Sequence, residues 1–207
     1  MKIILLTILS FLSLWGLSFD ELIYKNEVRA SFDCSKVKNN GKNDDELIIC
    51  NKIGAINEFE NKKLALMDNI FISLYQELLK NANENIKEDF KLVVKKMFRE
   101  RKNCAKVISN DLLQADQDPQ SPFVYKTDCI EKTYAKVFLE LMQKAKKDTQ
   151  SKERLKQIFN NQVDRYENLI QMSIQDPIDL EIFIDNLAQE GLIDDNARLK
   201  LWKAILK

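Results

Sequence analysis

The chain has 207 residues, of which 32 are Lys or Arg, 32 are Asp or Glu and none is His. Without histidine, a Ser-His-Asp triad, a Cys-His dyad and a His-ligated metal site are excluded. The balanced charge provides no global field for nucleic acid or an anionic membrane, so we expect neither partner, and we expect no cofactor. Only 4 Gly and 3 Pro are present, which favours long helices.

The N-terminus has the features of a secretory signal peptide. Met1 and Lys2 precede an apolar run that ends near Trp15, and Gly16 and Ser18 are small residues spaced as before a cleavage point. We expect cleavage after Ser18 and a periplasmic or secreted product that is not stably inserted in a membrane. The alternative is an uncleaved anchor, but a run of roughly 13 residues is shorter than the ~20 that span a bilayer.

The four cysteines, Cys34, Cys50, Cys104 and Cys129, all follow the predicted signal. An even number of cysteines in an exported chain indicates disulfides. Zinc is the alternative, but its structural sites usually use close Cys-x-x-Cys pairs, which are absent here, and this absence also disfavours a redox-active role. Of three possible connectivities we favour Cys34–Cys50 with Cys104–Cys129, because each pair closes a local loop.

Apolar residues recur with helical spacing over most of the mature chain. We expect residues 19–43 to be irregular and a short helix to begin at an Asp44 or Asp45 cap. Longer helices are predicted, in chain order, at residues 58–80, 87–109, 127–146, 151–173 and 177–190, with a last helix beginning at 194 or 195.

This pattern predicts an all-α fold, namely a disulfide-stapled antiparallel helical bundle with an additional C-terminal helical segment. The short connection near residues 81–85 makes the first two long helices antiparallel neighbours. We place the signal at 1–18, the four-cysteine domain at 19–147 and the C-terminal segment at 148–207.

The second predicted long helix carries the densest basic run in the chain: Lys91, Lys95, Lys96, Arg99, Arg101, Lys102 and Lys106. One interpretation is a positive helix face that docks an acidic partner. The other is a solvated face whose charges pair with acids of neighbouring helices. Arg101 differs from the others because it falls on the apolar stripe and therefore needs a partner. Asp68, on the inner edge of the first long helix, is expected to be the partner of Arg101 or of a backbone donor. Glu131 and Glu140 are expected at the surface.

Residues 116–126 are predicted to form a loop that could bind a partner. Phe123 and Tyr125 could act as anchors, with Lys126 beside them, or these aromatic residues could pack back onto the bundle. Together with Lys95, Arg99 and Lys102 of the basic run, these three residues are our candidate partner-binding set.

Several short motifs, taken together, resemble one known family. They are Ser31-Phe32-Asp33-Cys34, Glu46 with Ile49-Cys50, Leu64-Ala65-Leu66-Met67-Asp68, Leu74-Tyr75, Arg101-Lys102-Asn103-Cys104, and Cys129 with Thr133 and Tyr134. This combination resembles the N-terminal domain of the LprI-type lysozyme-inhibitor family over residues 31–145. The resemblance implies a small exported bacterial domain that binds and blocks a lysozyme-type muramidase.

The expected function is therefore that of an exported, non-catalytic protein-binding module, with lysozyme as the first candidate partner. The alternative is a periplasmic structural or adaptor module that binds another envelope protein. An enzyme is the least favoured class, because the sequence offers no histidine and no paired-carboxylate motif.

Overall fold

The computed structural model describes residues 18–25, 29–39, 43–52, 58–106, 121–176 and 178–200. The helices are α1 (Phe19–Lys25), α2 (Asp44–Ile49), α3 (Glu58–Asn81), α4 (Glu84–Lys106), α5 (Ser121–Ala145), α6 (Thr149–Ile158), α7 (Val163–Ser173) and α8 (Ile178–Gln189), with a 3-10 turn at Cys34–Lys36. Among the described residues the only β contact is an isolated bridge between Ile193 and Leu199. The all-α prediction is confirmed. Apart from Ser18, the predicted signal peptide lies outside these ranges.

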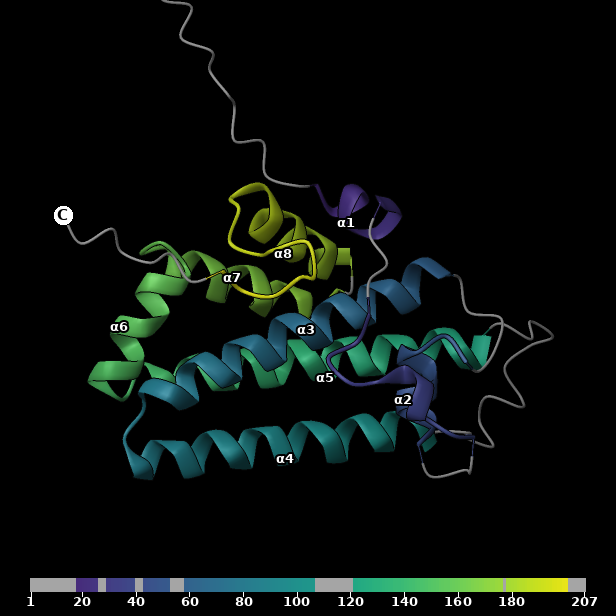
Figure 1. The fold of residues 1–207 in the computed structure, drawn as a ribbon, viewed down its shortest axis with the longest axis horizontal. Coiled ribbons are helices and arrows are strands. Elements are labelled where there is room, and N and C mark those ends of the chain that lie inside the picture. Colours follow the sequence, from purple (N-terminus) through teal and green to yellow (C-terminus); the bar gives the residue numbers. More distant parts are fainter. Residues whose placement is uncertain are drawn as a thin grey trace, which may run out of the picture.

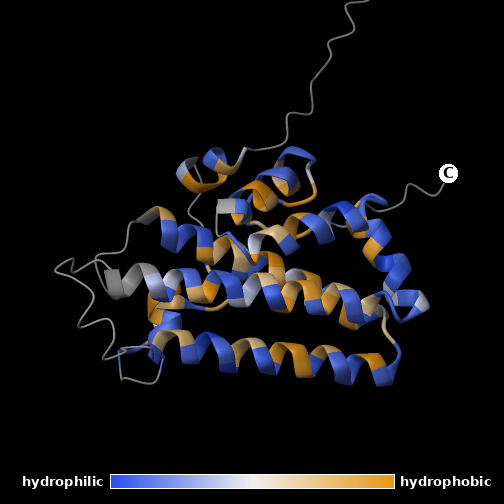
Figure 2. Ribbon diagram, turned by 180° about the vertical axis from the view of Figure 1, so that it is seen from behind, coloured by the Kyte–Doolittle hydropathy of each residue, from blue (hydrophilic) through white to orange (hydrophobic). Residues whose placement is uncertain are grey.

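The three longest helices, α3, α4 and α5, lie along the long axis of the molecule (Figure 1). Helix α4 forms one edge and runs antiparallel to both α3 and α5. On the opposite side, α1, α7 and α8 cover α3 and α5, while α6 turns across one end. Each long helix alternates apolar and hydrophilic positions along its length (Figure 2), as expected for helices that bury one face.

Helix α5 lies at the centre of the apolar core. Its Phe138 ring packs edge-on against Phe159, at a centroid distance of 6.5 Å, and against Phe183 at 5.3 Å. Tyr134 and Leu141 on the same helix are also fully buried. The helices before and after residue 148 therefore share one hydrophobic core, and the boundary placed there remains a prediction.

Both predicted disulfides are present. The Cα atoms of Cys34 and Cys50 are 5.6 Å apart, and those of Cys104 and Cys129 are 5.5 Å apart. The first disulfide ties the segment before α2 to the end of that helix, and the second ties the end of α4 to the first half of α5. The all-α bundle is therefore stapled at the end where α2, α4 and α5 meet (Figure 1).

The expectation of an irregular segment at residues 19–43 is wrong at its start, where α1 forms. Ser18 and Glu21 make a reciprocal capping box, in which the Glu21 amide donates to Ser18 Oγ at 3.2 Å and the Ser18 amide donates to Glu21 Oε2 at 3.1 Å. Leu22 and Ile23 are buried, and the Phe19 amide donates to Asp185 Oδ1 on α8 at 2.9 Å. This short helix is thus stabilised by tertiary contacts.

The single helix predicted at 151–173 is divided in the structure into α6 and α7. Asn160 and Asn161 both have positive φ angles, of 47° and 63°, and the Asn161 amide donates to the Lys156 carbonyl at 2.7 Å. This bond closes a helix C-cap in which Asn tolerates the left-handed conformation. The chain then reverses so that Tyr166 packs on Phe159, with ring centroids 5.1 Å apart.

Two predicted helix starts also differ from the structure. Helix α5 begins at Ser121, six residues before the predicted start, because Pro122 is compatible with a first helical turn. Residues 121–126 are therefore helical, and residues 107–120 lie outside the described ranges. Neither Asp44 nor Asp45 caps α2, because the helix already includes Asp44 and its N-cap is Asn43, which makes no side-chain capping bond. The Asp45 side chain is instead buried in the core.

The last predicted helix does not form over residues 194–200, and residues 201–207 lie outside the described ranges. Asp194 Oδ1 instead accepts from the amides of Asn196 and Arg198, both at 2.9 Å, and closes a tight turn. The turn places Ile193 opposite Leu199, and both side chains are buried. The Leu199 amide donates to Ser73 Oγ on α3 at 3.0 Å, which fixes the turn to the bundle.

Candidate functional site: the basic edge of helix α4

The outer side of α4 carries a line of exposed cations, which we call the α4 basic stripe: Lys95, Arg99, Lys102 and Lys106. Spacings of four, three and four residues place these side chains on one helix face. At 1.5 Å per residue the stripe is about 16 Å long. Because α4 lies at one edge of the bundle (Figure 1), this face is not covered by another described helix.

The pairing of the α4 lysines separates the two interpretations of the basic run. Lys91 pairs with Glu88 and Lys96 with Glu140, each at 2.6 Å, so these two cations belong to a solvated face neutralised by nearby acids. None of the four stripe side chains makes a hydrogen bond or ion pair with any described residue. The stripe is therefore an uncompensated positive surface, which favours the docking interpretation for these positions.

Exposed apolar side chains adjoin the α4 basic stripe. Leu92, 58% exposed, precedes Lys95 by one turn, and Phe98 precedes Lys102 by one turn. The Phe98 ring lies under the Arg101 guanidinium, 5.1 Å from its central carbon, which fixes the ring at the surface. A surface that combines exposed cations with fixed apolar side chains is typical of partner-binding patches.

The other candidate residues lie in the first turns of α5. Tyr125 is 55% exposed, so of the two alternatives for this residue the structure favours the exposed anchor over packing back onto the bundle. It lies one turn before Cys129, whose disulfide partner Cys104 is close to Lys102 in sequence, so Tyr125 is at the same end of the bundle as the stripe. Lys126 is half-buried and has a partner, and the Phe123 side chain is outside the described set.

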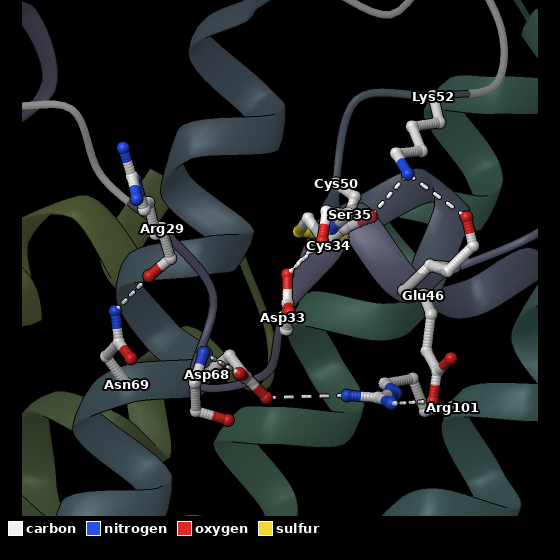
Figure 3. The surroundings of a disulfide bond; sticks show 12 residues. Arg29, Asp33, Cys34, Ser35, Glu46, Cys50, Lys52, Asp68, Asn69 and Arg101 are labelled. Atoms are coloured by element: carbon white, nitrogen blue, oxygen red, sulfur yellow. Dashed lines mark hydrogen bonds and ion pairs between the residues drawn. A yellow bond between two sulfur atoms is a disulfide. The ribbon is translucent and has the colours of Figure 1, made fainter.

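Beneath the stripe, Arg101 is buried with the partners that its position on the apolar face requires. Its Nε lies 2.6 Å from Asp45 Oδ2, and its Nη1 lies 3.4 Å from Asp68 Oδ1 and donates to the Tyr134 hydroxyl at 2.8 Å. Tyr134 in turn donates to Asp68 Oδ1 at 2.6 Å. Figure 3 shows the Arg101 guanidinium between Asp68 of α3 and Glu46 of α2. The prediction that Asp68 is the partner of Arg101 or of a backbone donor is confirmed on both counts, because Asp68 Oδ2 also accepts from the Ser31 amide at 2.8 Å.

The electrostatics of this cluster keep Arg101 charged. Burial alone would lower the pKa of the guanidinium, but Tyr134, Asp68 and Asp45 outweigh burial and raise it. Burial and the adjacent Asp68 carboxylate raise the pKa of Tyr134 well above its usual value, so the phenol stays protonated and donates. The cluster joins α2, α3, α4 and α5, and it therefore fixes the position of the helix that carries the stripe.

Glu131 does not lie at the surface, and this part of the prediction is wrong. Its side chain is 1% exposed and lies 3.1 Å from Lys63 Nζ, which also pairs with Glu60 at 2.8 Å and with Glu181 of α8 at 3.2 Å. Burial raises the pKa of Glu131 to about 8, although Lys63 opposes this shift. Burial acts to lower the pKa of Lys63. The nearby Glu131 and Glu60 carboxylates have the larger combined effect, so the pKa of Lys63 is raised.

The sequence does contain the signal that would have revealed this second cluster. Lys63 precedes Met67 by four residues, and Glu131 precedes Tyr134 by three, so both lie on faces whose other members are apolar. Glu140, the other acid expected at the surface, is partly exposed and pairs with Lys96. The Lys63 cluster connects α3 and α5 to α8.

Among the described residues, no group of three or more His, Cys, Asp or Glu side chains is arranged to hold a metal ion. The helices of these residues include none that is long and apolar enough to cross a membrane. Comparisons of the chain with protein-family models, curated proteins and solved structures find no match.

Proposed function

We propose that this chain is an exported, non-catalytic binding protein that docks an acidic protein partner through the α4 basic stripe. The observation that carries the proposal is that the side chains of Lys95, Arg99 and Lys102 have no partner among the described residues, next to lysines on the same helix that are paired. Exposed charges of one sign accelerate encounter with a surface of opposite sign and select against like-charged partners.

We further propose a lysozyme-type muramidase as the partner. The motifs listed for the LprI-type family support this, since they include Arg101, Asp68 and Tyr134, the residues that form the buried cluster under the stripe. Glycosidases of this kind hold two carboxylates in an open substrate cleft. A row of cations beside fixed apolar side chains complements such a cleft in charge and in shape.

The buried carboxylates support a non-catalytic role, because each of them already lies beside a basic side chain in the folded protein. Asp45 and Asp68 are both paired with Arg101, and Glu131 faces Lys63 in a closed cluster. None of these acids is placed next to an open cavity with a second free carboxylate, which acid-base hydrolysis would require.

The test is inhibition of several lysozymes by the mature protein at micromolar concentration, at about 50 and 300 mM salt. We expect inhibition that weakens at the higher salt, because exposed charges are screened. The triple variant K95E/R99E/K102E should inhibit at least 100-fold less well. The matched control is K147E/K152E/K200E, which makes the same charge change at exposed lysines outside α4 and should inhibit like the wild type.

Failure of the wild-type protein to inhibit any lysozyme would contradict the muramidase proposal. In that case, capture from envelope extracts with the wild type and the stripe variant would test the adaptor alternative. A partner retained by the wild type and lost by K95E/R99E/K102E would keep the stripe as the docking surface. Equal capture by both proteins would contradict it.

A further inference from the structure

A cavity of about 650 Å³ lies on a different part of the molecule from the α4 basic stripe. Its walls come from the segment at residues 29–35, the end of α2, the first half of α3 and the turn at 196–198, and none of its lining residues belongs to α4. Figure 3 shows part of this wall, with Arg29, Asn69 and the Cys34–Cys50 disulfide. The volume is within the range of small-molecule sites.

The charged groups around this cavity are mostly positive. Arg29, Lys62 and Arg198 line it, and the Arg198 side chain makes no hydrogen bond or ion pair with any described residue. The only acid in the lining is Asp33. Its carboxylate is engaged by the Ser35 amide at 3.0 Å, by Ser35 Oγ at 2.6 Å and by Lys36 at 3.2 Å. The cavity therefore presents the Arg198 guanidinium, which no described side chain neutralises, beside a single acid that is already engaged.

Side-chain amides supply the other polar groups of the cavity, from Asn51, Asn61, Asn69 and Asn196. Asn61 donates to Asn51 Oδ1 at 2.6 Å, while its own Oδ1 is buried without a hydrogen-bond donor. Amide side chains offer both donors and acceptors, which suits hydroxyl or amide groups of a ligand. An apolar ligand would leave these groups without partners.

The walls are held in place by bonds between distant parts of the chain. Asn69 of α3 donates to the Arg29 carbonyl, and Lys62 Nζ donates to the Ile23 carbonyl at 2.9 Å. The turn that carries Arg198 is tied to α3 through the Leu199 amide and Ser73 Oγ, and the Cys34–Cys50 disulfide closes the remaining side. A site preorganised in this way binds with a smaller loss of conformational entropy.

We propose that this cavity binds a small polar anion, namely a carboxylate or phosphate on a hydroxyl- or amide-bearing molecule. The Arg198 guanidinium recognises the oxyanion, because guanidinium groups form short charge-assisted hydrogen bonds to it. The asparagines recognise the polar body. This site is independent of the α4 basic stripe and of the partner proposed for it.

The experiment is calorimetric titration of the full mature protein with three probes of one size: glucose 6-phosphate, glucuronate and glucose. We expect at least one of the two acids to bind at millimolar concentration or below, and glucose to bind at least tenfold more weakly. The two acids separate a phosphate ligand from a carboxylate ligand. The variant R198Q should weaken binding of the acid by tenfold or more.

The control is K200Q, which removes the same charge two residues away, at an exposed lysine that does not line the cavity. It should bind like the wild type, and thermal unfolding of both variants should match that of the wild type. Absence of binding by both acids would overturn the proposal. Equal binding of glucose, or equal weakening by K200Q and R198Q, would overturn the assignment of the anion to Arg198.

Discussion

Arg101 Nε and Asp45 Oδ2 are 2.6 Å apart, and both side chains are 1% exposed to solvent. The pair connects α4 to α2, which is only six residues long and too short to be stable alone. A buried ion pair contributes little net stability compared with apolar residues, but removing one partner leaves the other charge buried and alone. The docking of α2 onto α4 therefore depends strongly on this one guanidinium.

We expect Arg101→Met to lower the free energy of unfolding by about 3 to 5 kcal/mol, because Asp45 and Asp68 would both lose their cation. Urea unfolding followed by circular dichroism, with the disulfides intact, measures this loss. Arg99→Met is the matched control on the same helix, and its cost should be at most about 0.5 kcal/mol at an exposed site. Similar losses for the two variants would contradict the role given to Arg101.

The two disulfides should stabilise the fold separately. They close loops of 16 and 25 residues, for which chain entropy in the unfolded state predicts about 3 kcal/mol each. We expect C34S/C50S and C104S/C129S each to lose about this amount in guanidinium unfolding. Adding a reductant should then destabilise each variant further, because one disulfide remains. No further loss in either variant would show that the remaining pair is not bonded.

Glu131 predicts a fall in stability between mildly acidic and mildly alkaline pH. Its pKa in the folded state is raised to about 8, above that of an exposed carboxyl, so the folded state binds the proton more tightly than the unfolded state. The stabilisation is complete below the unfolded pKa and is lost as pH rises toward about 8. One pKa unit corresponds to about 1.4 kcal/mol, so we expect a loss of about 2 to 4 kcal/mol from this residue.

The Glu131→Gln variant separates this contribution from the other titrating groups. Removing the ionisable group should flatten the pH dependence of unfolding between about pH 5 and 8, since Lys63 keeps Glu60 and Glu181 as partners. Glu153→Gln, at an exposed acid on α6, should retain the wild-type profile. A wild-type profile in Glu131→Gln as well would show that Glu131 is not the group responsible.

The sequence alone predicted those structural features that depend on a single local pattern of residues. Apolar periodicity located α3, α4 and α8, Arg101 on an apolar face required a buried partner, and local loop closure gave the correct disulfides. The same rule applied to Lys63 and Glu131 would also have placed both inside the bundle. For the site, sequence identified Lys95, Arg99 and Lys102, but only the three-dimensional structure shows that their side chains have no partner in the part of the chain that it describes.

The role of Asp45 and the cavity at Arg198 depend on tertiary contacts, which cannot be predicted from neighbouring residues in the sequence. Asp45 is equivalent to Asp44 as a potential helix cap, and only its place opposite Arg101 makes it a buried ligand of that residue. The cavity at Arg198 forms because a turn near the C-terminal end of the described chain returns to α3. Arg29 and Arg198 are 169 positions apart in the sequence and Lys62 and Asn196 are 134 apart, and both pairs meet at this cavity only in the folded protein.

Helices α6 and α8 are both followed by a residue in the left-handed conformation, Asn160 in one case and Gly191 in the other. Asn160 and Gly191 follow their helices with φ angles of 47° and 66°, and each is followed by an amide that donates to a carbonyl five residues earlier. The two sites therefore use the same motif with different residues. Gly enters this conformation without steric cost, Asn at a small cost and Ala at a larger one.

We expect Gly191→Ala and Asn160→Ala each to lower the free energy of unfolding by about 1 kcal/mol, and Asn160→Gly to be neutral or slightly stabilising. An added Cβ at Gly191 meets no atom within 4 Å, so its cost comes from the backbone conformation alone. Asn168→Ala, at an exposed position inside α7, is the control and should be neutral or stabilising because Ala favours the helix. Chemical unfolding of the four variants tests this, and an equal effect of Ala at Asn160 and at Asn168 would contradict the left-handed cap that separates α6 from α7.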